Sequence, residues 1–260
     1  MSISRFNSRI RCHERGSNVV DVSGSFISNI DYSIYRLNDI NSDKMNEKIN
    51  HPDSRNNKKT RKKKIIGFIA SPHKEGNTAW IVNKILEGAK MQDAETQAWY
   101  FSDLDIEPCR GCLGCHKGDR GCVINDDMQK LYGSIERADV IVLGSPIYMG
   151  HMSAQAKIFT DRLFAQISPR FSPHYKERKV KKKLILTFNQ GNPDTSMFQQ
   201  YIDYTKHIFE ILEFDVNVVP VVAGLRNGPA HERKDLDITL KAVGSSSVSE
   251  PRKDFRNSKE

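Results

Sequence analysis

Short apolar segments alternate with segments of helical periodicity between residues 64 and 243, and this alternation constrains the fold more than any other feature. The segment Ile65–Ala70 is apolar throughout, as expected of a strand buried on both faces of a sheet. Four further strands are predicted at Glu95–Phe101, Asp139–Gly144, Lys183–Asn189 and Val216–Val222. Strands that alternate with helices predict an α/β fold, a doubly wound five-stranded parallel sheet with helices on both faces.

The helices predicted between these strands carry apolar residues at helical spacing. The first, Thr78–Lys90, places Ile81 and Ile85 on one face. A second opens at Asn125-Asp126-Asp127 and runs to Arg137, because Asn and Asp accept hydrogen bonds from the free N–H groups of a helix start. Further helices are predicted at Ser153–Ala165, Thr195–Leu212 and Pro229–Val243.

The basic character of the chain is concentrated at its start. Residues 1–64 hold fourteen Lys and Arg against seven Asp and Glu, so most of the net charge of +8 lies there. Residues 1–63 also lack a sustained apolar period, which predicts a disordered basic leader with Cys12 as an incidental thiol and Met45 as an alternative start. Residues 64–243 are predicted to form one domain, and residues 244–260 a flexible tail. Because the domain is near neutral, we expect no nucleic-acid partner.

Nothing in the sequence predicts a membrane protein. Apolar runs such as Val140–Leu143 are far shorter than the roughly 20 residues that span a bilayer. The first eleven residues lack the apolar centre of a secretory signal peptide. We therefore expect a cytoplasmic protein without membrane contact, in a reducing compartment that suits free thiols.

Four cysteines lie within fourteen residues of the predicted loop 103–125: Cys109, Cys112, Cys115 and Cys122. Two-residue gaps let successive sulfurs converge on one small inorganic core, and an iron–sulfur cluster needs four thiolates. The six-residue gap before Cys122 contains two glycines, so this part of the chain can turn back towards the core. Structural zinc, disulfide bonds and unligated thiols stay open as alternatives.

The segment after the first predicted strand is typical of a phosphate site. It joins a buried strand to a helix start, where free N–H groups and the helix dipole attract an anion. Its spacing differs from that of a nucleoside-triphosphatase loop. A plain polar turn with an Asn or Thr cap is the alternative. The candidate residues here are Ser71, His73, Gly76, Asn77 and Thr78.

The segment after the third predicted strand offers a flat apolar surface. Tyr148 and Met149 supply that surface, Pro146 stiffens the chain, and Ser145 can bond the edge of a planar ring. A strand exit with one buried tyrosine is the alternative. Ligands of doubly wound sheets sit at the carboxyl ends of strands, so both segments belong to one expected site. The candidates are Ser145, Pro146, Ile147, Tyr148, Met149 and Gly150.

Taken in order along the chain, these motifs resemble those of the iron–sulfur flavoproteins, within the wider NAD(P)H-dependent FMN reductase group of flavodoxin-like folds. The resemblance covers about residues 64–243 and leaves the leader without a counterpart. It rests on Ser71-Pro-x4-Asn77-Thr78, the cysteine run, Cys122-x3-Asp126-Asp127-Met128, Gly144-Ser-Pro-Ile-Tyr148 and Ser153-Ala-Gln-x-Lys157-x3-Asp161-Arg162.

The resemblance implies two cofactors. Ser71, Asn77 and Thr78 would hold the phosphate of FMN, and Pro146–Gly150 would flank its isoalloxazine ring. Asn189, Gln190 and Gly191 would touch that ring from the other side. Cys109, Cys112, Cys115 and Cys122 would ligate a four-iron four-sulfur cluster. The group also tends to form homodimers or homotetramers, which we expect here.

The resulting functional hypothesis is an electron-transfer oxidoreductase. FMN exchanges electrons singly or in pairs and a cluster passes one at a time, so together they would connect a ferredoxin-like donor to a two-electron acceptor. One alternative is an NAD(P)H-dependent FMN or quinone reductase without a cluster. Another is a zinc-stapled flavin-binding protein without turnover.

No dedicated catalytic acid or base is expected, because the flavin carries the chemistry. His116 is interpreted as an exposed loop residue, although it could also ligate a metal or donate a proton. Lys157, Asp161 and Arg162 are interpreted as a helix-face ion pair or a subunit contact.

Overall fold

The computed structural model describes residues 61–117, 121–166, 181–224 and 227–249, all within the unit Lys58–Glu260. The predictions for residues 1–60, including Cys12, lie outside the described residues. The elements are β1 (Lys64–Ile69), α1 (Asn77–Lys90), β2 (Glu95–Tyr100), α2 (Met128–Arg137), β3 (Val140–Tyr148), β4 (His151–Met152), α3 (Ala154–Arg162), β5 (Lys182–Gln190), α4 (Gln199–Ile211), β6 (Phe214–Val222) and α5 (Lys234–Ser249).

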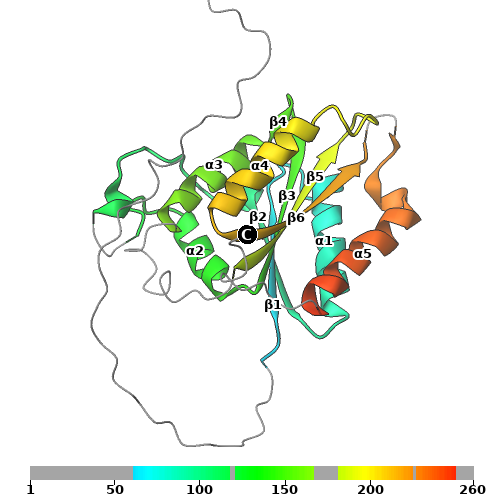
Figure 1. The fold of residues 1–260 in the computed structure, drawn as a ribbon, viewed down its shortest axis with the longest axis horizontal. Helices are drawn as coiled ribbons and strands as arrows, with labels where there is room; N and C mark the ends of the chain where they lie inside the picture. The colour runs from blue at the N-terminus through cyan, green and yellow to red at the C-terminus, as the bar shows by residue number, and fades with distance from the viewer. Residues whose placement is uncertain (1–60, 118–120, 167–180, 225–226, 250–260) are drawn as a thin grey trace, which may run out of the picture. The chain divides into compact units, whose positions relative to one another are not determined.

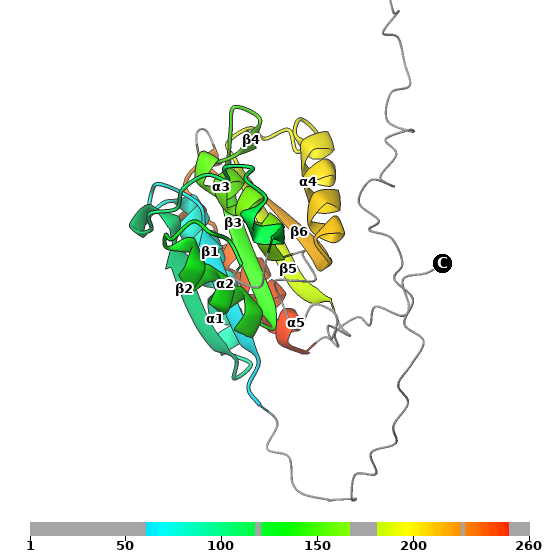
Figure 2. The same cartoon turned by 90° about the vertical axis from the view of Figure 1, so that its left-hand side faces the viewer.

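The predicted parallel sheet is confirmed. Its strands run in the order β2-β1-β3-β5-β6, and every pair along this path is parallel (Figure 2). This is the flavodoxin-like order, in which the chain moves first to one side of β1 and then to the other. The strand order therefore reverses between β1 and β3, and ligands of such sheets bind at the carboxyl ends of strands near this point.

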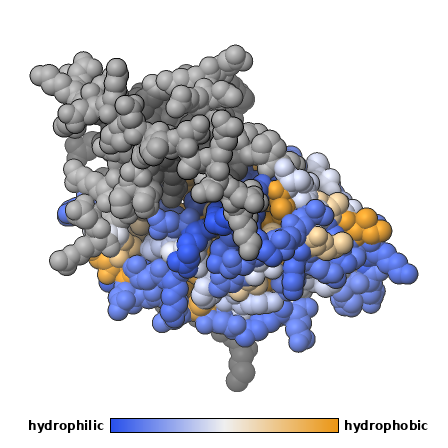
Figure 3. Space-filling model, turned by 90° about the horizontal axis from the view of Figure 1, so that it is seen from below, coloured by the Kyte–Doolittle hydropathy of each residue, from blue (hydrophilic) through white to orange (hydrophobic). Residues whose placement is uncertain are grey.

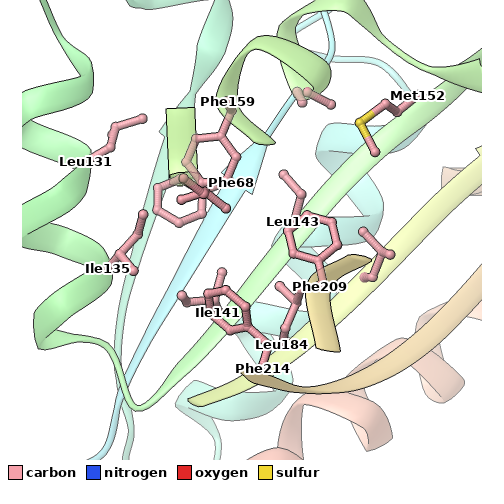
Figure 4. Packing of buried hydrophobic residues seen from close by; sticks show 14 of the residues in the cluster. Phe68, Leu131, Ile135, Ile141, Leu143, Met152, Phe159, Leu184, Phe209 and Phe214 are labelled. Atoms are coloured by element: carbon pink, nitrogen blue, oxygen red, sulfur yellow. The ribbon is translucent and has the colours of Figure 1, made fainter. Parts of the chain in front are cut away.

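Helices cover both faces of the sheet, with α2, α3 and α4 on one side and α1 and α5 on the other (Figure 1). Each strand supplies both layers, because successive side chains of a strand point to opposite faces. In β1, Phe68 packs with α2 and α3, whereas Ile69 packs with α1. The rings of Phe68 and Phe159 lie 5.0 Å apart at the centre of the first layer (Figure 4). Burial on both faces explains why β1 is apolar from Ile65 to Ile69.

Helix α5 corrects the prediction of a flexible tail from residue 244. The helix continues to Ser249, because its backbone packs directly against α1. A Cβ added to Gly244 would lie 1.9 Å from the carbonyl oxygen of Ile85, and one added to Gly88 would lie 2.0 Å from that of Lys241. Gly88 and Gly244 thus permit a close contact between α1 and α5 that no apolar period in the sequence predicts. Residues 250–260 of the predicted tail lie outside the described part of the chain.

Strand β3 is longer than predicted, running four residues past Gly144 to Tyr148. Ser145 and Pro146 keep their pairing with Phe188 and Asn189 of β5, so the expected loop is still part of the sheet. A short strand, β4, then pairs antiparallel with the end of β3 and adds a sixth strand to the five predicted.

Figure 3 views the end of the sheet at which β1 begins, opposite to the carboxyl ends of the parallel strands. Its described surface is mostly hydrophilic, with scattered hydrophobic residues. Among the helices that the structure describes, none combines the length and the hydropathy needed to cross a membrane.

Candidate flavin site and cysteine loop

Three of the predicted segments meet at the carboxyl edge of the sheet. The register pairs Ile69 with Gly144, Pro146 with Asn189, and Gln190 with Val222. Because these pairs connect neighbouring parallel strands, the segments after β1, β3 and β5 emerge beside one another. The structure thus brings the segments after β1 and β3, which sequence patterns placed in one expected site, beside the segment after β5 that the resemblance implied.

The first segment leads from β1 into α1 and leaves the start of that helix open. Ser71 is buried, and its hydroxyl accepts a hydrogen bond from the backbone N–H of His73 at 3.2 Å. Gly76 precedes the helix in an extended conformation, and no side chain caps the first turn. The plain polar turn with an Asn or Thr cap is therefore not what forms. An uncapped helix start presents N–H groups and a positive dipole end, a geometry that fits the phosphate of FMN.

Asn77 and Thr78 have structural partners that the sequence did not reveal. The Asn77 side-chain oxygen accepts a hydrogen bond from the backbone N–H of Ala230 at 2.8 Å, which ties the start of α1 to the segment after β6. Thr78 is buried, and its methyl carbon would lie 3.2 Å from a Cβ on Gly144. Asn77 therefore lies at the helix start with its side-chain oxygen already hydrogen-bonded to Ala230.

The second segment is a β-hairpin and not the predicted strand-exit loop. Met149 and Gly150 form its turn with φ of 50° and 84°, and β4 pairs Met152 with Ile147. Tyr148 is 46% exposed and Met149 is 96% exposed. The alternative of one buried tyrosine is wrong, because the hairpin carries Tyr148 away from the core. An exposed aromatic and thioether surface next to the helix start suits a planar ligand.

Ser145 and Ser153 connect the ends of β1, β3 and α3. The Ser153 hydroxyl donates to the carbonyl of Ala70 at 2.6 Å, and the Ser153 N–H donates to the Ser145 hydroxyl oxygen at 2.9 Å. The Ser153 oxygen also accepts from the N–H of Ala156 at 3.2 Å, capping α3. Ser145 itself is buried and donates to the carbonyl of Pro146 at 3.0 Å. Both serines therefore hold the edge together, a role the sequence had assigned to neither.

The third segment, at the end of β5, contains buried amides with unused acceptors. The side-chain oxygens of Asn189 and Gln190 are buried and have no hydrogen-bond partner among the described residues. The Gln190 nitrogen donates to the carbonyls of Asn192 and Asp194 at 2.8 and 2.9 Å, and Asn227 donates to the carbonyl of Gly191 at 2.7 Å. A buried acceptor without a donor costs about 1–3 kcal/mol. Because both oxygens are covered, a ligand donor reaches them only if this segment shifts.

The cysteine loop is less enclosed than the sheet edge. Cys109 and Cys112 are exposed, Cys115 and Cys122 are half-buried, and all four are free thiols. Partial burial raises the pKa of the Cys115 thiol, and the charge of nearby Cys122 raises it further. Among the described residues, no three His, Cys, Asp or Glu side chains form an arrangement that holds a metal ion. The donor set, four free thiols in one loop, nevertheless matches the chemistry of an iron–sulfur cluster.

His116 and Arg162 differ from their sequence interpretations. The ring of His116 is half-buried and stacks on Phe164, with centroids 4.7 Å apart, so it is not an exposed loop residue. Lys157 and Asp161 form the predicted helix-face ion pair, at 2.6 Å, and both are exposed. Arg162 instead is buried and forms an ion pair with Asp126. Burial alone would lower the pKa of Arg162, but the interactions with Asp126 and Tyr132 together outweigh it and raise the pKa, so the arginine stays charged.

Two further residues of α2 contact the end of the cysteine loop. The Gln129 side chain donates to the carbonyls of Cys122 and Ile124 at 2.9 and 2.7 Å. The Tyr132 hydroxyl donates to the carbonyl of Arg162 at 2.8 Å, and its burial raises the pKa of this phenol far above the usual value. Sequence reasoning missed both residues, since glutamine and tyrosine on a helix carry no signal of a loop contact.

A sequence model of the family described as NADPH-dependent FMN reductase matches residues 63–228, well over half of the chain. The match begins just before β1 and ends between β6 and α5, so it contains both the sheet edge and the cysteine loop.

Several curated relatives are iron–sulfur flavoproteins. One from Methanocaldococcus jannaschii is 39% identical over 99 residues, which are 38% of this chain and 51% of the relative. One from Methanosarcina thermophila has the same identity and coverage. The chain thus spans about half the length of the curated relatives it matches.

Solved structures share the fold at low sequence identity. An NAD(P)H:quinone oxidoreductase from Methanothermobacter marburgensis superposes with a TM-score of 0.55 at 14% identity, covering 71% of this chain and 98% of that one. An FMN-dependent NADH-azoreductase from Bacillus anthracis gives 0.51 at 12% identity, covering 72% and 100%. The sheet order, the open helix start and the matched sequence model agree. The chain belongs to the NADPH-dependent FMN reductase family of flavin oxidoreductases and, within it, is similar to the iron–sulfur flavoproteins.

Proposed function

We propose that this protein binds FMN at the carboxyl edge of its sheet and works as an FMN-dependent oxidoreductase with an iron–sulfur cluster in the cysteine loop. The observation that carries the proposal is the uncapped start of α1 beside the exposed β3–β4 hairpin. One end of this edge suits a phosphate and the other suits a flat ring. Family membership and the similarity to iron–sulfur flavoproteins support the same assignment.

In this proposal the residues divide the work of holding FMN. The N–H groups at the start of α1, with Ser71, His73, Gly76, Asn77 and Thr78 around them, bind the phosphate. The hairpin residues Pro146–Gly150 cover one side of the ring, with Ser145 holding the strand end beneath them. The segment Asn189–Gly191 faces the ring from the next strand. FMN, once bound, supplies the redox chemistry, which is why no protein acid or base is assigned.

The four thiols of the cysteine loop are assigned to the cluster. They are free, they lie within one loop, and no other cysteine lies among the described residues. A cluster accepts one electron at a time, so a ferredoxin-like protein is the proposed electron donor. A molecule that accepts two electrons is the proposed acceptor. Assembly into a homodimer or homotetramer would bring a loop of one chain near the flavin of another.

A reductase without a cluster is the second candidate. Two observations favour it: Cys109 and Cys112 are exposed, and the described side chains form no metal-holding group. In that case NAD(P)H would reduce FMN directly and the loop would be a surface element. The third candidate is a zinc-stapled flavin carrier. Metal analysis distinguishes it from the first two candidates.

Anaerobic purification of the full chain, followed by assays of iron, sulfide, zinc and FMN, separates these functions. The proposal predicts one FMN and about four iron and four sulfide per chain, with a broad visible absorbance. FMN without iron would favour the reductase that uses NAD(P)H. Stoichiometric zinc without iron would favour the carrier, and protein without flavin would contradict all three.

A further inference from the structure

A buried ion pair stands at the base of the cysteine loop. The side chains of Arg162 and Asp126 are only 1% and 3% exposed. Two guanidinium nitrogens of Arg162 donate to the two carboxylate oxygens of Asp126, at 2.6 and 3.0 Å. Such two-pronged pairs are geometrically specific, and a buried charge must have a partner to be tolerated. On the same helix, Lys157 and Asp161 form an exposed pair that makes a natural comparison.

Both members of this pair also bind Glu107, on the other side of the loop. Arg162 donates to the backbone carbonyl of Glu107 at 2.7 Å, and Asp126 accepts from its backbone N–H at 2.9 Å. Glu107 lies two residues before Cys109, and Asp126 lies four residues after Cys122. The pair therefore joins the chain entering the cysteine run to the chain leaving it.

Neighbouring contacts strengthen this junction. Asp127 and Asp105 exchange two hydrogen bonds: the Asp127 carboxylate accepts from the N–H of Asp105 at 2.9 Å, and the Asp127 N–H donates to the carbonyl of Asp105 at 3.0 Å. The Asp126 carboxylate also accepts from the N–H of Met128 at 3.1 Å, which anchors it to the start of α2. The base of the loop is thus fixed to α2 and α3, while Cys109 and Cys112 within it are exposed.

We propose that Arg162 is a positioning residue for the iron–sulfur cluster, and that with Asp126 it closes the base of the loop so that the four cysteines converge. This inference rests on the proposed cluster. Closing a flexible loop costs conformational entropy, and a loop whose ends are already joined needs less ordering when it wraps a ligand. The hydrogen bonds of the Arg162 guanidinium go to Glu107 and Asp126, and it acts through these two residues.

The test compares Arg162→Met with Lys157→Met, which removes a lysine from the exposed pair of the same helix. Each full-length protein is reconstituted anaerobically with ferrous iron and sulfide and then challenged with an iron chelator. In Arg162→Met we expect iron retention to fall about 10- to 100-fold, the range typical for residues that support metal ligands. FMN per chain should stay equal to that of the parent, and Lys157→Met should match the parent in both.

A second variant guards against misfolding, because Arg162→Met leaves the Asp126 charge buried and unpaired. The double variant Asp126→Asn, Arg162→Met has a neutral interior but no guanidinium to hold the Glu107 carbonyl. It should fold, keep FMN and still lose iron. Arg162→Lys should recover part of the iron retention, since one ammonium group can reach only some of these partners. A parallel fall of iron and FMN in the double variant would instead indicate a merely structural role and overturn the proposal.

Hydrogen exchange in cluster-free protein separates this inference from the proposed function. In peptides that cover residues 103–117, exchange should be faster in the double variant than in the parent or in Lys157→Met. If the parent binds no iron, the proposed cluster fails, and the exchange result alone decides whether Arg162 holds the loop. Unchanged exchange, or iron retention equal to the parent, overturns the inference.

Discussion

The proposed flavin edge, made of the segments after β1, β3 and β5, and the cysteine loop both follow the carboxyl ends of parallel strands, yet they are held in place by different means. Backbone pairing of β1, β3 and β5 sets the flavin edge, and two serines reinforce it. The cysteine loop has a buried ion pair at its base, and two of its four thiols, those of Cys109 and Cys112, are exposed. Backbone pairing thus holds the first region, whereas the second is anchored by the ion pair at its base and by the stacking of His116 on Phe164.

The largest expected effect comes from a substitution that should remove the cluster from the cysteine loop and leave the proposed flavin edge intact. Replacing Cys112 with Ser removes one thiolate ligand, so iron and the broad visible absorbance should be lost while FMN stays bound. Reduction of the flavin by a ferredoxin should slow in parallel. Iron and flavin content with stopped-flow reduction measure these effects. If the variant takes electrons from ferredoxin as fast as the parent, the loop does not feed the flavin.

A change at the helix start should have the reverse effect. Asn77→Asp keeps an oxygen for the Ala230 N–H but adds a negative charge at the expected phosphate position. Repulsion between like charges should weaken FMN binding by at least about tenfold, while iron uptake is unchanged. Asn83→Asp, an exposed change on the same helix, is the control. Equal flavin affinities in both variants and the parent, measured by fluorescence titration, would place the phosphate elsewhere.

Removing a serine should weaken the flavin edge itself. Ser153→Ala deletes the hydrogen bond to Ala70 and the cap of α3. We expect the free energy of unfolding to fall by about 1–2 kcal/mol, measured by urea denaturation of the flavin-free protein. Thr160→Val, which removes a hydroxyl bonded only within α3 and to Met152, should cost less. A larger loss in the control would show that the edge does not depend on Ser153.

Acid should loosen the loop before the sheet. Burial tends to raise the pKa of Asp126, but hydrogen bonds from Arg162 and Glu107 outweigh this and lower it. A carboxyl with a lowered pKa stabilises the folded form above the unfolded-state value of about 3.9, and this contribution is lost as the pH falls below it. Hydrogen exchange of cluster-free protein at pH 5 and pH 3 should show residues 103–117 opening first. Simultaneous opening of β1 would contradict the separation of the two regions.

The smallest effect is expected from the leader. A chain that begins at Arg61 keeps the ion pair of this residue with Asp139 and all of β1, so both cofactors should be retained. Cys12→Ser in the full chain should likewise change neither iron nor flavin content. Loss of either cofactor from the shortened chain would show that the leader supports one of the regions.

Much of the fold was predictable because its signals are local. An apolar run such as Ile65–Ala70 predicts a buried strand, and the spacing of Ile81 and Ile85 predicts a helix, without knowledge of distant residues. The alternation of such segments then leads to a doubly wound sheet. The predicted end of α5 was wrong because Gly244 contacts Ile85, which lies far away in the sequence. The extension of β3 was missed because it depends on continued pairing with β5.

By itself, the sequence predicted which segments would carry the chemistry: a strand-to-helix turn, an apolar strand end and a run of four cysteines. Only the tertiary structure decided how these segments are supported. Asn77 bonds Ala230, and Arg162 bonds both Asp126 and Glu107, partners that lie tens to more than a hundred residues apart. A residue type reveals what a side chain can bond, but the packing of helices on the sheet selects the partner, because buried polar groups must be paired where they come to lie.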